Sequence, residues 1–192
     1  MRLFVAADPS AEVRRAAASR LVELKRTLEP HEFSGSIRWV PEENLHLTVW
    51  FLGEVSEQRG LAVLEALRPG LQTAAFELKL SGFGAFPPGG CPRVLWLGVA
   101  AGLTQLASAH AEVGKRLEPL GFAPEGRTYS AHVTVARIRS PLASKDRVVL
   151  RQALQVTAAD PGVCRVEGLT VYRSRTTPKG AMYEPLQRVP LS

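Results

Sequence analysis

Two segments of the chain alternate apolar and polar residues as a half-buried β-strand does. In NLHLTVWFLG, at 44–53, the alternation places Leu45, Leu47, Val49 and Phe51 on one face and His46, Thr48 and Trp50 on the other. In SAHVTVARI, at 130–138, it places Ala131, Val133 and Val135 on one face and His132 and Thr134 on the other. Two predicted strands therefore carry the same His-x-Thr pattern on a single face.

The rest of the chain alternates between strand-like and helix-like patterns. Strands are predicted at 2–8, 36–41, 76–86 and 93–99, and a hairpin at 164–175 and 181–189 around the turn TTPKG. Helices are predicted at 10–28, where Ser10 is the N-cap, and at 57–67, 102–121 and 145–154. The order strand, helix, His-x-Thr strand, helix, strand therefore occurs twice, on either side of the break PPGGCP at 87–92.

This repetition predicts the domain organisation. We expect one bilobed domain over 1–192, with an internal duplication of approximately 1–86 and 93–192 whose lobes can exchange terminal strands. The fold class is α+β, with two related lobes of antiparallel sheet and helix around a pseudo-twofold axis. Such an axis brings His46 and His132 to one central cleft.

The net charge, the apolar runs and the cysteines of the chain indicate which ligands and which cellular location to expect. The 192 residues carry a net charge of +6, with the basic residues dispersed along the chain, which favours an anionic ligand over a cationic one. No apolar run approaches the roughly 20 residues that cross a bilayer, and the N-terminal run is too short for a signal peptide. Cys91 and Cys164 belong to no CxxC pair. We expect a cytoplasmic monomer with no membrane partner.

Two histidines and two threonines on shared faces favour acid–base chemistry. One neutral imidazole can take a proton from water while a second, protonated imidazole gives one to a leaving oxygen. The hydroxyls of Thr48 and Thr134 can hold an anion between them, which indicates a phosphodiester. A metal site needs three or four ligands, and neither motif carries a second ligand at short spacing. We therefore predict no metal and no cofactor.

The segments HLTVWFLG and AHVTVAR resemble the paired HxTx motifs of the two-histidine phosphoesterase superfamily, in its bacterial and archaeal RNA 2′,3′-cyclic phosphodiesterase (LigT or 2′-5′ RNA ligase-like) branch. The likeness covers nearly the whole chain, including the opening RLFVAAD and the closing YRSRTTPKGAMYEPL. It implies antiparallel sheets around a cleft, with the chain ends building one lobe and the middle building the other. It also implies opening of a 2′,3′-cyclic phosphate to a 2′-phosphomonoester.

The resemblance also implies roles for individual residues. His46 resembles the proton donor to O3′, His132 the base that activates water, and Thr48 and Thr134 the phosphate anchors. The residues alone do not say which histidine is acid and which is base.

Three further positions are compared with the family. Ala131 replaces the proline that usually precedes the second histidine. Tyr129 matches a family aromatic and is either a base-stacking platform or a wedge at the cleft rim. Arg137 matches a phosphate-binding arginine, but strict alternation turns it away from His132, so a bulge or a long reach is required.

The remaining histidines, His31 and His110, lack a threonine two places on, and we interpret them as surface and packing residues.

Three functions stay open. The first is an RNA 2′,3′-cyclic phosphodiesterase, able in principle to run in reverse as a 2′-5′ RNA ligase. The second keeps the chemistry but acts on small nucleotide cyclic phosphates or 2′-5′ oligonucleotides. The third is a non-catalytic RNA- or nucleotide-binding module, which would not need a matched acid and base.

Overall fold

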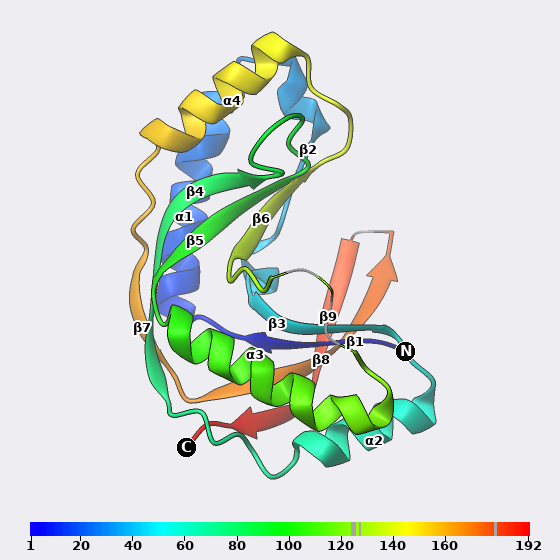
Figure 1. Cartoon of the computed structure of the whole chain (residues 1–192). Coiled ribbons are helices and arrows are strands. Elements are labelled where there is room, and N and C mark those ends of the chain that lie inside the picture. Colours follow the sequence, from blue (N-terminus) through cyan, green and yellow to red (C-terminus); the bar gives the residue numbers. More distant parts are fainter. Residues whose placement is uncertain (124–125, 127, 179) are drawn as a thin grey trace.

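The computed structural model describes residues 1–123, 126, 128–178 and 180–192. Over these residues the chain forms an antiparallel sheet in the order β7-β4-β5-β6-β3-β1-β8-β9, with β2 added beside β6 (Figure 1). The strands are β1 (Arg2–Ala7), β2 (Ile37–Trp39), β3 (Leu47–Glu54), β4 (Phe76–Phe86), β5 (Val94–Ala101), β6 (Val133–Ile138), β7 (Gly162–Val166), β8 (Gly168–Thr177) and β9 (Gly180–Pro190). The α-helices are α1 (Ala11–Leu28), α2 (Glu57–Leu67), α3 (Leu103–Leu117) and α4 (Ser144–Val156). The predicted α+β class is confirmed.

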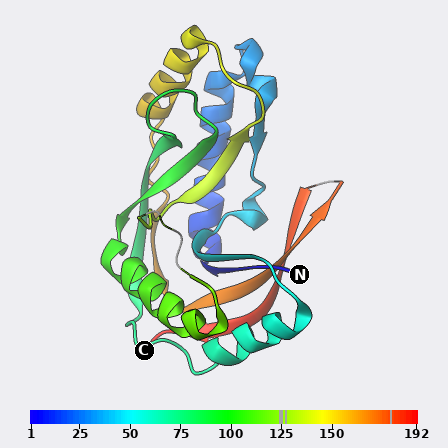
Figure 2. The ribbon, with the colours of Figure 1, turned by 45° about the vertical axis from the view of Figure 1, so that its right-hand side comes forward.

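The sheet has two halves, which join where the two His-x-Thr strands meet. β3 and β6 pair at Leu47 and Val133, the central residues of the two motifs. One half contains β3, β1, β8 and β9, and the other contains β6, β5, β4 and β7. Figures 1 and 2 show these halves as two lobes, and the β8–β9 hairpin rises from the lower lobe beside the junction. The bilobed fold therefore places both motifs at its centre.

The ends of the chain contribute neighbouring strands. β1, near the N-terminus, lies between β3 and β8, and β8 pairs with the C-terminal β9. Two helices pack against the half of the sheet opposite to the strand that precedes them. α1 follows β1 but packs against α4 and β7, and α3 follows β5 but packs against β3 and α2. The proposed duplication into 1–86 and 93–192 stays a prediction, because this exchange distributes each segment over both lobes.

The predicted helix at 10–28 shows how local chemistry builds the core. The Ser10 side chain accepts a hydrogen bond from the Val13 amide at 3.2 Å, which caps the helix. One stripe of α1 is buried, at Val13, Ala17, Leu21, Leu24 and Leu28. Burying a leucine fully contributes about 1.5–3 kcal/mol, so this stripe fixes the helix against the sheet. No helix among the described residues is long and apolar enough to span a membrane.

The predicted strand at 164–175 is divided in the structure. β7 pairs with β4 at the edge of one half, whereas β8 pairs with β1 and β9 in the other half. The division falls at Glu167, and Gly168 then passes close to β9, where a Cβ would come within 2.9 Å of the Val189 carbonyl oxygen. The β8–β9 hairpin itself is confirmed. The predicted turn at 176–180 includes Lys179, which lies outside the described residues.

Candidate active site

Both motif histidines lie immediately before their strands, not within them as the alternation predicted. β3 begins at Leu47 and β6 at Val133. The reason is a short local hydrogen bond in each motif: Nδ1 of His46 donates to the Asn44 carbonyl at 2.8 Å, and Nδ1 of His132 donates to the Ser130 carbonyl at 2.7 Å. A carbonyl oxygen only accepts, so Nδ1 carries the hydrogen and Nε2 is the nitrogen available for proton transfer.

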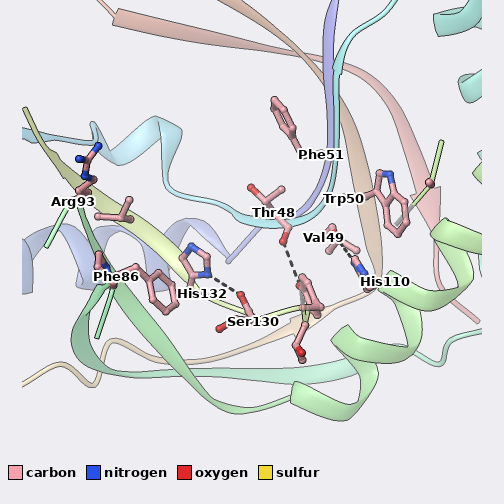
Figure 3. A pocket seen from close by; sticks show the side chains of 14 residues that line it. Thr48, Val49, Trp50, Phe51, Phe86, Arg93, His110, Ser130 and His132 are labelled. Carbon is pink, nitrogen blue, oxygen red and sulfur yellow. Dashed lines mark hydrogen bonds between the residues drawn. The ribbon is translucent and has the colours of Figure 1, made fainter. Parts of the chain in front are cut away.

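The strand register brings the two motifs together. Because β3 and β6 run antiparallel and pair at Leu47 and Val133, Thr48 lies beside His132 and His46 lies beside Thr134. Nε2 of His46 is 3.1 Å from the Thr48 hydroxyl oxygen. Thr48 and His132 line the same cavity, from opposite lobes (Figure 3).

A β-bulge changes which side chains of β3 face the cleft. Ala6 of β1 pairs with Thr48 and Val5 pairs with Trp50, so Val49 is an extra residue in β3. The bulge reverses the alternation beyond it, and the prediction that Trp50 shares the His46 face is wrong. Trp50 is 5% exposed and packs against α3, where it still forms part of the cavity wall, whereas Phe51 is 44% exposed and lines the same cavity.

The second motif has a bulge at the equivalent place. Trp96 of β5 pairs with Thr134 and Leu95 pairs with Ala136, which leaves Val135 as the extra residue. The predicted need for a bulge is thereby met, and Arg137 returns to the side of His132. Its positive charge lowers the pKa of both catalytic histidine candidates, as expected of a cation close to both.

His110 and Tyr129 hold the first bulge in place. Nδ1 of His110, on α3, donates to the Val49 carbonyl at 2.7 Å, and the Tyr129 hydroxyl donates to the Thr48 carbonyl at 3.2 Å. The two rings stack, with centroids 4.3 Å apart and an interplanar angle of 10°. Tyr129 lines the cavity, and its two alternative roles, wedge and base-stacking platform, stay predictions. His110 is the packing residue expected, with a hydrogen bond that the sequence did not indicate.

This contact predicts the effect of a substitution at His110. His110→Leu should lower the free energy of unfolding by about 1–3 kcal/mol, because the Val49 carbonyl loses its donor next to a buried residue. His110→Gln, whose amide can donate in the same direction, should recover part of the loss. Urea denaturation of the two variants measures the difference. A leucine variant as stable as the wild type would contradict the role of this hydrogen bond.

The charged groups that shift the pKa differ between the two motif histidines. Burial is the main effect on both and lowers the pKa of His46 and of His132. The Asp8 carboxylate raises the pKa of His46 against this burial, whereas Arg137 lowers the pKa of both rings. Asp8 accepts a hydrogen bond from Thr170 at 2.8 Å and borders a cavity of about 170 Å³ beside His46. No motif marks Asp8 in the sequence beyond its place at the end of the first predicted strand.

The main cavity extends away from Thr48 and His132. It has a volume of about 620 Å³ and is largely lined by aromatic and apolar groups, among them Phe51, Phe86 and Tyr129. Phe86 meets the His132 ring edge-on, with centroids 5.0 Å apart. A cavity of this size and lining accommodates a nucleoside-sized ligand.

Paired imidazoles and hydroxyls at the junction of two lobes define a phosphoesterase with two histidine motifs. The model of the LigT-like phosphoesterase family matches the chain twice, at residues 12–96 and 97–183, and the chain therefore belongs to that family. The two consecutive matches each contain one of the motifs.

Sequence relatives match over nearly the full length. The chain is 34% identical over 189 residues to the RNA 2′,3′-cyclic phosphodiesterase of Archaeoglobus fulgidus, covering 97% of this chain and 98% of that one. It is 32% identical over 187 residues to the corresponding Thermotoga maritima enzyme, covering 97% and 93%.

A solved structure shows the same fold. Escherichia coli LigT complexed with 3′-AMP superposes with a TM-score of 0.73 and 26% identity, covering 100% of this chain and 98% of that one.

Proposed function

We propose that the protein hydrolyses RNA 2′,3′-cyclic phosphate ends to 2′-phosphomonoesters, with His46 as general acid and His132 as general base. The observation that carries the proposal is the junction of the two His-x-Thr motifs, in which Nδ1 of each imidazole is bonded to a backbone carbonyl and Nε2 of His46 contacts only the Thr48 hydroxyl of its own motif. The naming of its relatives as RNA 2′,3′-cyclic phosphodiesterases supports the substrate class.

The proton transfers follow from the ring tautomers. Nε2 of neutral His132 accepts a proton from water as the water oxygen attacks phosphorus. The bond from phosphorus to O3′ breaks, and protonated His46 gives its Nε2 proton to O3′. Thr48, Thr134 and Arg137 hold the phosphate oxygens meanwhile. The product carries its phosphate on O2′, and the two rings return to their starting states by exchange with solvent.

The asymmetry of charge supports this assignment of acid and base. Asp8 favours the protonated form of His46, whereas no carboxylate among the described residues raises the pKa of His132. A carboxylate beside His46 stabilises the imidazolium form of this ring, which supports the role of acid for His46. The cavity beyond Thr48 and His132 would then hold the terminal nucleoside.

Product analysis tests the proposal. An oligonucleotide with a 2′,3′-cyclic phosphate end is incubated with the protein, and the product end is identified by mass and by digestion with a 3′-specific phosphatase. A 2′-phosphomonoester is expected. A 3′-phosphomonoester would reverse the leaving group, and an unchanged substrate would overturn the proposed activity. A parallel reaction with an added 5′-hydroxyl oligonucleotide tests whether the same groups catalyse 2′-5′ ligation.

A second candidate substrate is a small nucleotide. Escherichia coli LigT has been solved with 3′-AMP and with ATP, at 26% and 27% identity to this chain, so nucleotides bind this family without a longer RNA. Comparing kcat/KM for a cyclic mononucleotide and for a cyclic-ended oligonucleotide separates the two candidates. A clear preference for the mononucleotide would favour the small-nucleotide activity.

Metal independence is a separate expectation. The two imidazoles supply both proton transfers, so a metal is not needed to generate hydroxide. Dialysis against a chelator should leave kcat unchanged, with a zinc hydrolase treated in parallel as the positive control. Loss of activity that an added divalent ion restores would show that a metal takes part.

A further inference from the structure

An unusual pair of like charges lies on the strands beside the site. β2 is only three residues long, and its pairing with β6 places Arg38 directly opposite Arg137. Side chains directly opposite in an antiparallel pair leave the sheet on the same face, where like charges destabilise each other. Both arginines are exposed. Their repulsion suggests that an anion lies between or beside them when the site is occupied.

No acidic side chain balances this pair within the described part of the chain. None of the ion pairs found there involves Arg38 or Arg137. The hairpin shows the contrasting arrangement, because Arg173 and Arg175 both contact Glu184, at 2.6 and 3.4 Å. The hairpin arginines are neutralised internally, whereas Arg38 and Arg137 are left for an external anion.

Arg38 lies on the β3 side of β6. The other edge of β6 pairs with β5, so β2 continues along the same edge as β3, and Arg38 is one strand spacing, about 4.8 Å, from Arg137 on that side. Its guanidinium reaches toward the tip of the β8–β9 hairpin, where a Cβ at Gly180 would come within 3.0 Å of Nη2. The hairpin also carries Tyr183, whose ring is 5.1 Å from that of His46. Arg38 is therefore at the rim of the same cleft.

We propose that Arg38 binds the phosphate on the 5′ side of the terminal nucleotide, which makes an oligonucleotide end the preferred substrate. This inference rests on the proposed function, in which Arg137 and the two threonines hold the cyclic phosphate. A guanidinium suits a second phosphate because it presents paired donors in a fixed plane. A 2′,3′-cyclic nucleoside phosphate has no such second phosphate and gains nothing from Arg38.

The test compares two substrates across matched variants. One substrate is a 2′,3′-cyclic nucleoside phosphate and the other is a dinucleotide with the same terminal base and the same cyclic end. Arg38→Gln should raise KM for the dinucleotide about tenfold more than for the mononucleotide. It should also reduce the salt slope of log(1/KM) for the dinucleotide by about 0.7, the value for one phosphate contact to a single strand. Arg165→Gln removes an exposed charge at the edge strand β7. It should change neither the ratio of the two KM values nor the salt slope for the dinucleotide.

A binding measurement keeps this test apart from the test of catalysis. Dissociation constants are measured for a nucleoside 3′-phosphate and for a dinucleotide ending in a 3′-phosphate, in wild type and in Arg38→Gln. If the wild type turns over neither cyclic substrate, the proposed function fails, and this arm still decides whether Arg38 contacts the second phosphate. Equal effects of Arg38→Gln on both ligands, or no effect on either, would overturn the inference.

Discussion

Replacing either motif histidine should abolish most of the turnover. His46→Ala and His132→Ala are each expected to lower kcat by about 10²–10⁴-fold, the usual contribution of one general acid or base. Both rings sit at strand starts, and their Nδ1 contacts are to carbonyls only two residues away, so no long-range contact of the fold depends on these bonds. Steady-state kinetics on a cyclic-ended oligonucleotide, with circular dichroism to check folding, provides the measurement.

The matched control is His31→Ala. The ring of His31 stacks on Phe33, 5.6 Å away, next to a short 3₁₀ turn before β2. Its removal should leave kcat as in the wild type. The double variant His46→Ala/His132→Ala should be little worse than the poorer single variant, since acid and base act on one transition state. Near wild-type activity in either single variant would disprove the two-histidine mechanism.

Local signals in the sequence were enough to predict the helices and most strands. The Ser10 cap and the buried stripe of α1 depend only on neighbouring residues, so their spacing predicts the helix correctly. The His-x-Thr pairs were predictable for the same reason, because two copies of one local pattern indicate one shared site. The bulge at Val135 was one of the two possibilities, with a long reach, that the likeness of Arg137 to a phosphate-binding arginine required, and the register of β5 and β6 shows the bulge.

The bulge at Val49 could not be predicted in this way. Val49, Trp50 and Phe51 are all apolar, so no polar side chain marks the position where the alternation reverses. Its carbonyl bond to His110 joins residues 61 apart in the chain, and local patterns carry no information about such a contact. The exchange of α1 and α3 between the halves, and the division at Glu167, likewise depend on which strands become neighbours. Pairing between strands that are distant in the sequence therefore decides which aromatic side chains face the cavity.

The second large expected effect is a bell-shaped dependence of kcat/KM on pH, centred below 6.5. The active form needs a protonated acid and a neutral base, so its population is greatest at the mean of their two pKa values in the free enzyme. The ordinary histidine pKa is 6.5, and burial lowers the pKa of both His46 and His132. Beyond each side of the bell the rate should fall about tenfold per pH unit. A profile centred above pH 7 would contradict the electrostatics of the site.

Asp8→Asn should then show which ring is the acid. The substitution removes the charge that raises the pKa of His46, while the asparagine oxygen can still accept from Thr170. On the alkaline side of the bell, the active fraction is proportional to the fraction of the acid still protonated. On the acid side, it is proportional to the fraction of the base that is neutral. With His46 as the acid, kcat/KM should fall on the alkaline side only, by up to about tenfold if the pKa falls by one unit.

The control removes a different carboxylate from the same cavity. Glu43 lines the cavity beside His46, yet its charge is not among those that shift the pKa of His46, so Glu43→Gln should leave both sides of the bell unchanged. If His46 were instead the base, Asp8→Asn would raise kcat/KM on the acid side and leave the alkaline side as it was. Full pH profiles of wild type, Asp8→Asn and Glu43→Gln on one cyclic-ended oligonucleotide therefore assign both histidines, because the two mechanisms change opposite sides of the bell in opposite directions.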